Sequence, residues 1–301
     1  VYDIGRQRIP QVVTARLRAA YGVNMYTWAD LERDLAILTA QGAETVDIGY
    51  SLLGRPIVAV HKGDLSGPQV LMQASMHARE WATTPLVLRM MRDYDSDGGV
   101  WCVPMVNPDG VLLSQFGLES VAEQPLRDFL LRVNGYDNDF RLWKADARAV
   151  DLNVNWNADW GTGAQNVFAP APGNYVGPYP CSESENIALR DFTNRTQPRV
   201  TLSYHARGNV VYAGFGCRNP YPDCARRIAD AMGYPLSDSA NSAGGYKDWF
   251  VTTTDRLGLT VEIGAETTPY DQIADGLDEI VRAQARTLEI ASECARQIAR
   301  E

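Results

Sequence analysis

Residues 70–80 read VLMQASMHARE, and this stretch decides the fold. Its first five residues are apolar apart from one glutamine, which is typical of a strand buried on both faces. The strand leads directly into a loop that carries His77 and Glu80. In an open sheet between helices, functional side chains gather at the carboxyl ends of the strands. The stretch therefore predicts a buried strand that brings two polar side chains to one edge of a sheet.

Further apolar runs of this kind recur along the chain, at residues 100–106, 200–204, 210–215 and 259–263. Segments with helical spacing of apolar residues lie at 85–94, 182–196 and 223–232, and one long amphipathic pattern closes the chain at 271–300. Strands that alternate with helices are typical of a sheet covered on both faces. We predict a three-layer α/β/α sandwich with a mixed, mostly parallel central sheet.

The N-terminal part predicts one helix and two strands. Residues 27–41 have apolar residues at helical spacing, with Thr27 placed to cap the helix and Gly42 to end it. Residues 46–60 read as two strands around a turn. Because no linker or repeat divides the chain, we expect one domain at residues 26–301, preceded by an N-terminal extension at 1–25.

Composition excludes several classes of protein. The 301 residues are 45% apolar and 22% charged, which is ordinary for a globular chain. The net charge of −9 argues against a nucleic-acid-binding surface. Arg89 and Asp93 interrupt the best candidate membrane span, so no apolar stretch reaches about 18 residues. We expect no nucleic-acid partner, no membrane span and a monomer.

Histidine is scarce, since the chain holds only His61, His77 and His205. The spacing of His77 and Glu80 lets one turn aim both at the same point, and His205 ends another predicted strand. Two imidazoles and a carboxylate form an open zinc site whose fourth position holds water. We predict one Zn²⁺ on His77, Glu80 and His205. The alternatives are a His–Glu surface contact and a buried structural histidine. His61 is interpreted as a turn or surface residue.

Glu262 is a charged residue inside an apolar predicted strand. Burying a carboxylate costs free energy unless the group is paired or serves a function. A zinc-bound water needs a carboxylate base that does not itself bind the metal. We therefore predict that Glu262 is the general base, with a buried salt bridge as the alternative.

These residues resemble the zinc carboxypeptidase superfamily, peptidase family M14, from about Tyr26 to Ile290. The motifs that carry the resemblance are Ile48-Gly49-Tyr50-Ser51, His77-Ala78-Arg79-Glu80, Val106-Asn107-Pro108-Asp109-Gly110, Asp151-Leu152-Asn153, Ser203-Tyr204-His205 and Thr260-Val261-Glu262-Ile263-Gly264. The resemblance implies an α/β/α fold, zinc on the three predicted ligands and Glu262 as base and acid. It also implies that Arg79 polarises the scissile carbonyl or binds substrate, and that Asn153 touches a substrate carboxylate.

Two departures from the family narrow the expected function. Classical carboxypeptidases have Asn-Arg where this chain has Asn153-Val154, so the arginine that clamps a C-terminal carboxylate is missing. Where the family carries an arginine that stabilises the oxyanion, this chain offers Lys144, with Arg148 as a near alternative. Either cation could instead be an ordinary surface residue.

Residues 244–250, GGYKDWF, look most like the bacterial γ-D-glutamyl-L-diamino acid endopeptidase branch, which cuts peptidoglycan stem peptides. The position of the family's usual lid tyrosine falls on Ala240, so Tyr246 is the candidate aromatic donor to substrate. Lys247 would favour an acidic group in the pocket beyond the cut. Arg207 is a second candidate anion binder, or a solvated arginine. The branch often has an acidic residue where this chain has Val154.

The sequence thus predicts a zinc metallopeptidase that hydrolyses peptide or muropeptide substrates. The alternatives are a metallocarboxypeptidase for acidic C-terminal residues, an amidase of small acylated amino acids, and a catalytically dead protein that binds cell-wall peptides. Cys217 and Cys224 bracket a short loop that a disulfide could close, or both are reduced. We expect a secreted or cell-envelope protein, with a cytoplasmic location as the alternative.

Overall fold

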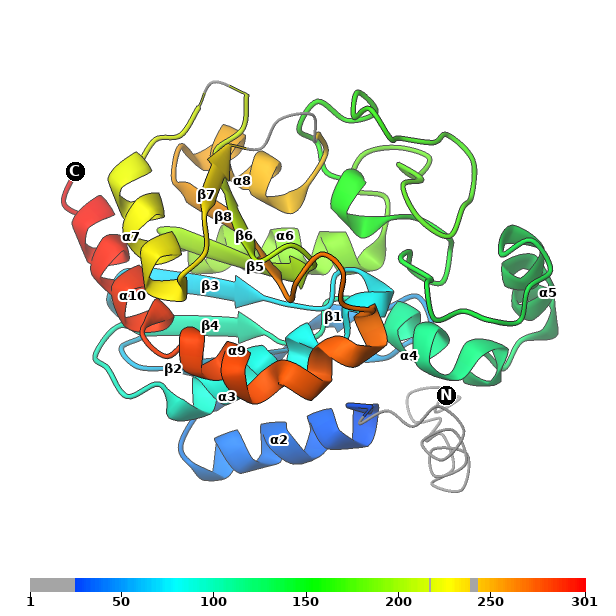
Figure 1. Cartoon of the computed structure of the whole chain (residues 1–301), viewed down its shortest axis with the longest axis horizontal. Helices are drawn as coiled ribbons and strands as arrows, with labels where there is room; N and C mark the ends of the chain where they lie inside the picture. The colour runs from blue at the N-terminus through cyan, green and yellow to red at the C-terminus, as the bar shows by residue number, and fades with distance from the viewer. Residues whose placement is uncertain (1–24, 217, 239–242) are drawn as a thin grey trace.

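A computed structural model describes residues 25–216, 218–238 and 243–301 of the chain. Within these residues, eight strands form one sheet in the order β1-β2-β4-β3-β5-β8-β6-β7 (Figure 1). The strands span Glu44–Tyr50 (β1), Pro56–Lys62 (β2), Gln69–Gln73 (β3), Gly99–Val103 (β4), Val200–Ala206 (β5), Val210–Ala213 (β6), Leu236–Asp238 (β7) and Leu257–Ile263 (β8).

The centre of the sheet is parallel and its flanks are mixed. Strands β4, β3, β5 and β8 run parallel to their neighbours within this group. The pairs β1–β2, β2–β4 and β6–β8 are antiparallel, while β7 pairs with β6 in parallel. This arrangement confirms the predicted mixed sheet. Strand β7 was not predicted, because its three residues are partly or fully exposed and form no apolar run.

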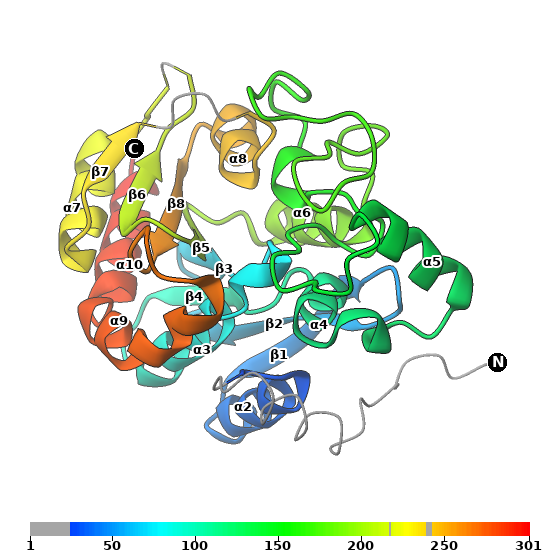
Figure 2. The ribbon, with the colours of Figure 1, turned by 45° about the vertical axis from the view of Figure 1, so that its right-hand side comes forward.

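Helices cover both faces of the sheet. Successive residues of a strand point to opposite faces, so Val70 and Met72 of β3 join one apolar cluster and Leu71 joins another. Helices α3 (Thr83–Asp93), α7 (Pro222–Met232) and α10 (Thr287–Ile298) contribute to the first cluster. Helices α6 (Ser184–Thr196) and α8 (Tyr246–Thr254) contribute to the second (Figure 2).

The remaining helices lie around this sandwich. Helices α2 (Trp28–Ala40) and α9 (Leu277–Ala283) pack against α3. The predicted start of α2 is confirmed, since Asp30 Oδ2 accepts a hydrogen bond from the Thr27 backbone at 2.8 Å. Helices α4 (Pro108–Phe116) and α5 (Gln124–Val133) enclose a third apolar cluster that includes Ala78 and Trp143. This cluster supports two of the loops that carry the predicted site residues.

The segment at 271–300 differs from the single long amphipathic pattern. It forms a 3₁₀ helix, Tyr270–Gly276 (η4), followed by α9 and α10, which are separate helices. Gln284 lies between α9 and α10, where its buried side chain accepts a hydrogen bond from the Tyr204 hydroxyl at 2.9 Å. The break at Gln284 lets α10 turn and pack on the sheet, so it depends on a partner in a distant strand.

The interpretation of His61 as a surface residue is wrong. Its side chain lies in β2 and is 2% exposed, with Nε2 3.0 Å from Gln69 Oε1 and the ring packed on Trp101. His61 is therefore a satisfied core histidine.

Three other predictions concern the ends of the chain, a cysteine pair and membrane insertion. The predicted extension at residues 1–25 lies outside the described residues except for Met25. Cys217 of the predicted Cys217–Cys224 pair also lies outside them. Among the helices that the structure does describe, none is both long and apolar enough to cross a bilayer.

Candidate active site

The loop that follows β3 is fixed by buried hydrogen bonds before it reaches His77. Ser75 has a φ of 49°, and its backbone N–H donates to Thr83 Oγ1 at 2.9 Å. The Asn107 side chain donates to the Met76 carbonyl oxygen at 3.1 Å. These bonds hold the loop against α3 and α4. His77 therefore leads into the 3₁₀ helix Ala78–Glu80 (η1) in a fixed direction.

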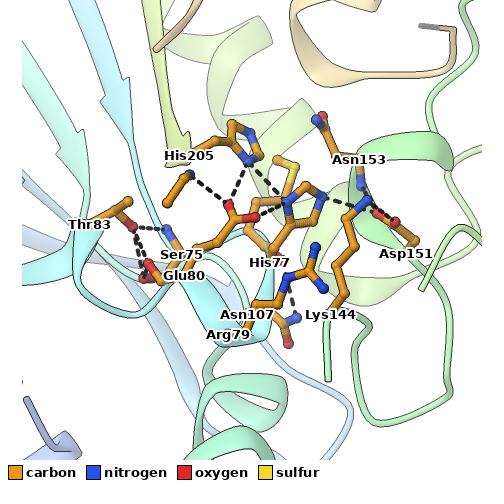
Figure 3. Close-up of polar contacts among 12 residues, drawn as sticks. Ser75, His77, Arg79, Glu80, Thr83, Asn107, Lys144, Asp151, Asn153 and His205 are labelled. Atoms are coloured by element: carbon orange, nitrogen blue, oxygen red, sulfur yellow. Dashed lines mark hydrogen bonds and ion pairs between the residues drawn. The ribbon is translucent and has the colours of Figure 1, made fainter. Parts of the chain in front are cut away.

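His77, Glu80 and His205 converge at the carboxyl ends of β3 and β5 (Figure 3). His77 Nδ1 lies 2.9 Å from Glu80 Oε1, and His205 Nδ1 lies 3.0 Å from Glu80 Oε2. The two Nδ1 atoms are 3.1 Å apart. One donor atom from each side chain lies within 4.8 Å of the others, and all three residues are buried.

The three side chains fit a zinc ion. Two imidazole nitrogens and a carboxylate are the donor set of open zinc sites. Glu80 Oε2 is also held by the Ala206 backbone N–H at 3.2 Å, which fixes the carboxylate against both imidazoles. At the other side of its ring, His77 Nε2 lies 3.2 Å from Asp151 Oδ1. Zinc-binding histidines commonly place their second ring nitrogen against a carboxylate in this way.

Asp151 is a site residue that the sequence analysis missed. It is fully buried, and its Oδ2 lies 2.8 Å from Lys144 Nζ while its Oδ1 faces His77. Its oxygens also accept from the backbone N–H groups of Asn153 and Asn174, at 3.0 and 2.9 Å. Asp151 stood in one of the quoted motifs, but only a contact across 74 residues of chain reveals its partnership with His77.

Neighbouring charges set the protonation states of the two carboxyl groups in the site, Glu80 and Asp151. Burial raises the pKa of Glu80, but the neighbouring His77 and His205 outweigh it and hold that pKa well below its usual range. Burial likewise raises the pKa of Asp151, and Lys144 and His77 reverse the effect, so its pKa is also well below the usual range. Both carboxylates are therefore ionised at neutral pH and available to a cation.

Glu262 lies beside this cluster without belonging to it. In the parallel pair of β5 and β8, Glu262 is level with His205, and both alternate with the apolar residues that face α10. Burial and the nearby Glu80 charge raise the pKa of Glu262 to about 7, although His205, Lys144 and Arg79 act in the opposite direction. A carboxyl group with this pKa can both accept and return a proton near neutral pH.

Arg79 and Arg207 both contact the ring of Tyr270. The guanidinium carbon lies 4.3 Å from the ring centroid for Arg79 and 4.8 Å for Arg207. Arg79 Nη1 also donates to the Leu142 carbonyl oxygen at 3.4 Å, and Arg207 Nη1 donates to that of Thr268. The structure thus brings these two predicted substrate-binding residues together at the edge of the metal cluster.

The two candidate oxyanion cations differ in position. Lys144 is 18% exposed in its side chain and contacts Asp151, so it lies within the site. The Arg148 side chain is 52% exposed, and its Nε lies 3.7 Å from Glu183 Oε2. Within the described contacts, Arg148 is directed toward the start of α6 instead of the metal cluster.

The predicted residues around α8 are buried. Tyr246 is fully buried among aromatic side chains, and its hydroxyl lies 2.9 Å from Thr193 Oγ1. Helix α8 thus turns the Tyr246 ring into the aromatic core, and none of its described contacts is with the metal cluster. Lys247 contacts Asp248 and the Gly214 carbonyl oxygen. Asn153 is partly buried, and its Oδ1 accepts from the Tyr246 backbone N–H at 3.0 Å.

Comparisons with known proteins agree with this site. Residues 29–282 match the family model described as zinc carboxypeptidase. Over 244 residues the chain is 36% identical to γ-D-glutamyl-L-diamino acid endopeptidase 1 of Lysinibacillus sphaericus, an alignment that covers 74% of this chain and 61% of that protein. This chain therefore spans less than two thirds of that relative's length.

Solved structures support the fold. Carboxypeptidase A from Helicoverpa armigera superposes with a TM-score of 0.74 at 18% identity, covering 97% of this chain and 81% of that one. The murein-tripeptide amidase MpaA from Escherichia coli O157 gives a TM-score of 0.53 at 21% identity, covering 80% and 91%. The family model extends over most of the chain and includes all three residues of the metal cluster together with Glu262, so the chain belongs to the M14 family of zinc carboxypeptidases.

Proposed function

We propose that this chain is a zinc-dependent peptidase that hydrolyses the bond between γ-D-glutamate and the diamino acid in peptidoglycan stem peptides. The observation that carries the proposal is the convergence of His77, Glu80 and His205 beside a strand-borne Glu262. The name of the 36% identical relative supports the choice of substrate.

The proposed mechanism assigns each proton to a side chain of this protein. His77, Glu80 and His205 would hold zinc, which would supply a Lewis acid to polarise a carbonyl and to lower the pKa of a water molecule. Glu262 takes a proton from the attacking water and delivers it to the leaving amine, for which a pKa of about 7 is suited. Lys144 stabilises the negative charge that develops on the carbonyl oxygen. Arg148 is the second candidate, and it would have to leave Glu183 to reach that oxygen.

Lys247 is the proposed source of preference on the amine side of the bond. Its side chain is buried at the start of α8, where it pairs with Asp248, and an acidic substrate group would have to compete with that carboxylate for its positive charge. Stem peptides with diaminopimelate and with lysine at the third position differ in one carboxylate. We expect wild type to prefer diaminopimelate and Lys247→Met to lose that preference. An unchanged ratio of kcat/KM in a folded variant would exclude this role.

One experiment tests the proposed function directly. The zinc-loaded protein is incubated with a defined disaccharide tetrapeptide that contains γ-D-Glu and diaminopimelate, and the products are identified by mass spectrometry. We expect a fragment that ends in D-glutamate and a fragment that begins with diaminopimelate. Removal of zinc by a chelator should stop the reaction, and added zinc should restore it.

The same products separate the alternatives. A metallocarboxypeptidase would release only the C-terminal residue, a reaction that Val154 does not favour because it cannot form the ion pair of the usual arginine. A protein that only binds cell-wall peptides would contain zinc and give no products.

A further inference from the structure

Two arginine side chains lie beside the metal cluster without an explained role. Arg79 stands between two predicted zinc ligands, and Arg207 follows His205 by two residues. Both guanidinium groups lie on the ring of Tyr270, at 4.3 and 4.8 Å, so their central carbons are no more than about 9 Å apart.

These two cations differ from the others near the site in having no counter-ion among the described residues. Lys144 is paired with Asp151, and Lys247 is paired with Asp248. Arg79 and Arg207 instead contact backbone carbonyl oxygens and the tyrosine ring, and the buried Nε of Arg79 has no hydrogen-bond partner. Each guanidinium has five N–H donors, so most of them remain available to a ligand.

Two like charges held together without a counter-ion repel each other, and a cation–π contact returns only about 0.5–2 kcal/mol. A chain with a net charge of −9 has many carboxylates that could neutralise the pair, yet none of those described contacts it. An anionic ligand relieves this repulsion, and a carboxylate matches the planar fork of a guanidinium.

The pair also lies at the reaction centre. The charge of Arg79 acts on Glu262, and η1, which contains Arg79, packs against η4, which begins with Tyr270. The side chain of Lys247 lies elsewhere, at the start of α8 against Gly214. Because Lys247 pairs with Asp248, the charges of Arg79 and Arg207 are the ones near Glu262 that no described carboxylate pairs with.

We infer that Arg79 and Arg207, held on Tyr270, bind the free α-carboxylate of the residue on the acyl side of the cut bond. This inference rests on the proposed function and adds to it. When glutamate is linked through its γ-carboxyl group, its α-carboxylate stays free and lies a short aliphatic chain from the scissile carbonyl. A peptide linked through α-carboxyl groups carries an anion at this distance only where the residue on the acyl side is itself glutamate. The pair therefore favours the γ-linkage over α-linked neutral residues.

The experiment compares two substrates that differ in one group: a stem peptide with γ-D-glutamate, and the same peptide with γ-D-isoglutamine, whose α-carboxylate is amidated. Wild type should favour the free acid by about 10- to 100-fold in kcat/KM, as expected for charge-assisted hydrogen bonds. Arg207→Gln and Arg79→Gln should each lower this ratio at least several-fold, mainly by slowing cleavage of the free acid.

Binding provides a readout that is independent of turnover. In a Glu262→Gln background, the dissociation constants of both peptides are measured by calorimetry, with and without Arg207→Gln. The free acid should bind more tightly, and the added substitution should remove the difference. Arg195→Gln is the matched control, because Arg195 lies 5.2 Å from the Phe192 ring but at an exposed position of α6.

The outcomes separate this inference from the proposed function. Equal cleavage and equal binding of the acid and the amide by wild type would overturn the carboxylate subsite while leaving the peptidase intact. A ratio that persists in both arginine variants would also overturn it. If neither γ-linked peptide is cleaved but both bind, the proposed reaction fails, and the calorimetric comparison still decides the subsite.

Discussion

Substitution of Asp151 by asparagine is the sharpest test of how the site is held together. The two carboxylate oxygens of Asp151 face four donors: His77 Nε2 at 3.2 Å, Lys144 Nζ at 2.8 Å and two backbone N–H groups. An asparagine has one oxygen and one NH₂ group. Whichever way its amide is turned, the NH₂ group meets donors that previously had an acceptor.

The expected magnitude follows from the loss of the carboxylate behind a zinc ligand. Such changes typically weaken metal binding 10- to 100-fold, equivalent to about 1.4–2.7 kcal/mol. Asp151→Asn should therefore bind zinc more weakly by this factor. Catalysis should fall as well, because Lys144 loses the carboxylate that holds it.

Zinc affinity is measured by competition with a chromophoric chelator, and folding is checked by circular dichroism. Asp139→Asn is the control, because Asp139 also pairs with an arginine but its side chain is 45% exposed. The reasoning is refuted if a folded Asp151→Asn protein binds zinc as tightly as wild type and the Asp139 control.

Three further predictions follow from the same structure. Glu262→Gln should keep the fold and the zinc content but lose about 10²–10⁴-fold in kcat, as measured by single-turnover cleavage, and a folded variant with normal kcat would exclude Glu262 as the base. A plot of kcat/KM against pH should have an acidic limb, because a base with a raised pKa is ionised, and active, only above that pKa. The positive charge of bound zinc should place the midpoint of this limb below the pKa of about 7. Arg79→Gln should move the midpoint upward, because Arg79 lowers the pKa of Glu262, and a downward shift would contradict the assignment. Arg55→Met should lower the free energy of unfolding in urea by about 3–5 kcal/mol, because Arg55 lies 2.5 Å from the fully buried carboxylate of Asp109 and its removal leaves that charge unpaired. A loss below about 1 kcal/mol would show that other groups compensate the charge of Asp109.

The sequence predicted the strands and the metal cluster well because both depend on local patterns. Residues 70–74 are apolar whichever partner they have, and His77 and Glu80 lie close along the chain. The third ligand, His205, could be placed because it also ends an apolar run. The positions of such residues in the fold can be predicted from the neighbouring sequence alone.

Features that depend on distant partners could not be read from the sequence. The role of Asp151 comes from His77, which lies in another loop. The break before α10 depends on Gln284 and Tyr204, which are 80 residues apart. Tyr246 and Lys247 are neighbours at the start of α8, and only the packing of that helix turns the tyrosine into the aromatic core.

Because Glu262 lies in β8, catalytic turnover depends on the correct alignment of β8 with β5. If β8 docked one residue out of place, Glu262 would turn to the opposite face of the sheet, among the apolar side chains that face α10. His77, Glu80 and His205 lie outside β8, so such a misaligned molecule keeps all three predicted metal ligands. In a refolded sample, the zinc content would then measure the number of molecules with a formed cluster. The amplitude of the catalytic burst would measure only the number in which β8 is also correctly aligned. The difference between these two numbers measures the misaligned fraction.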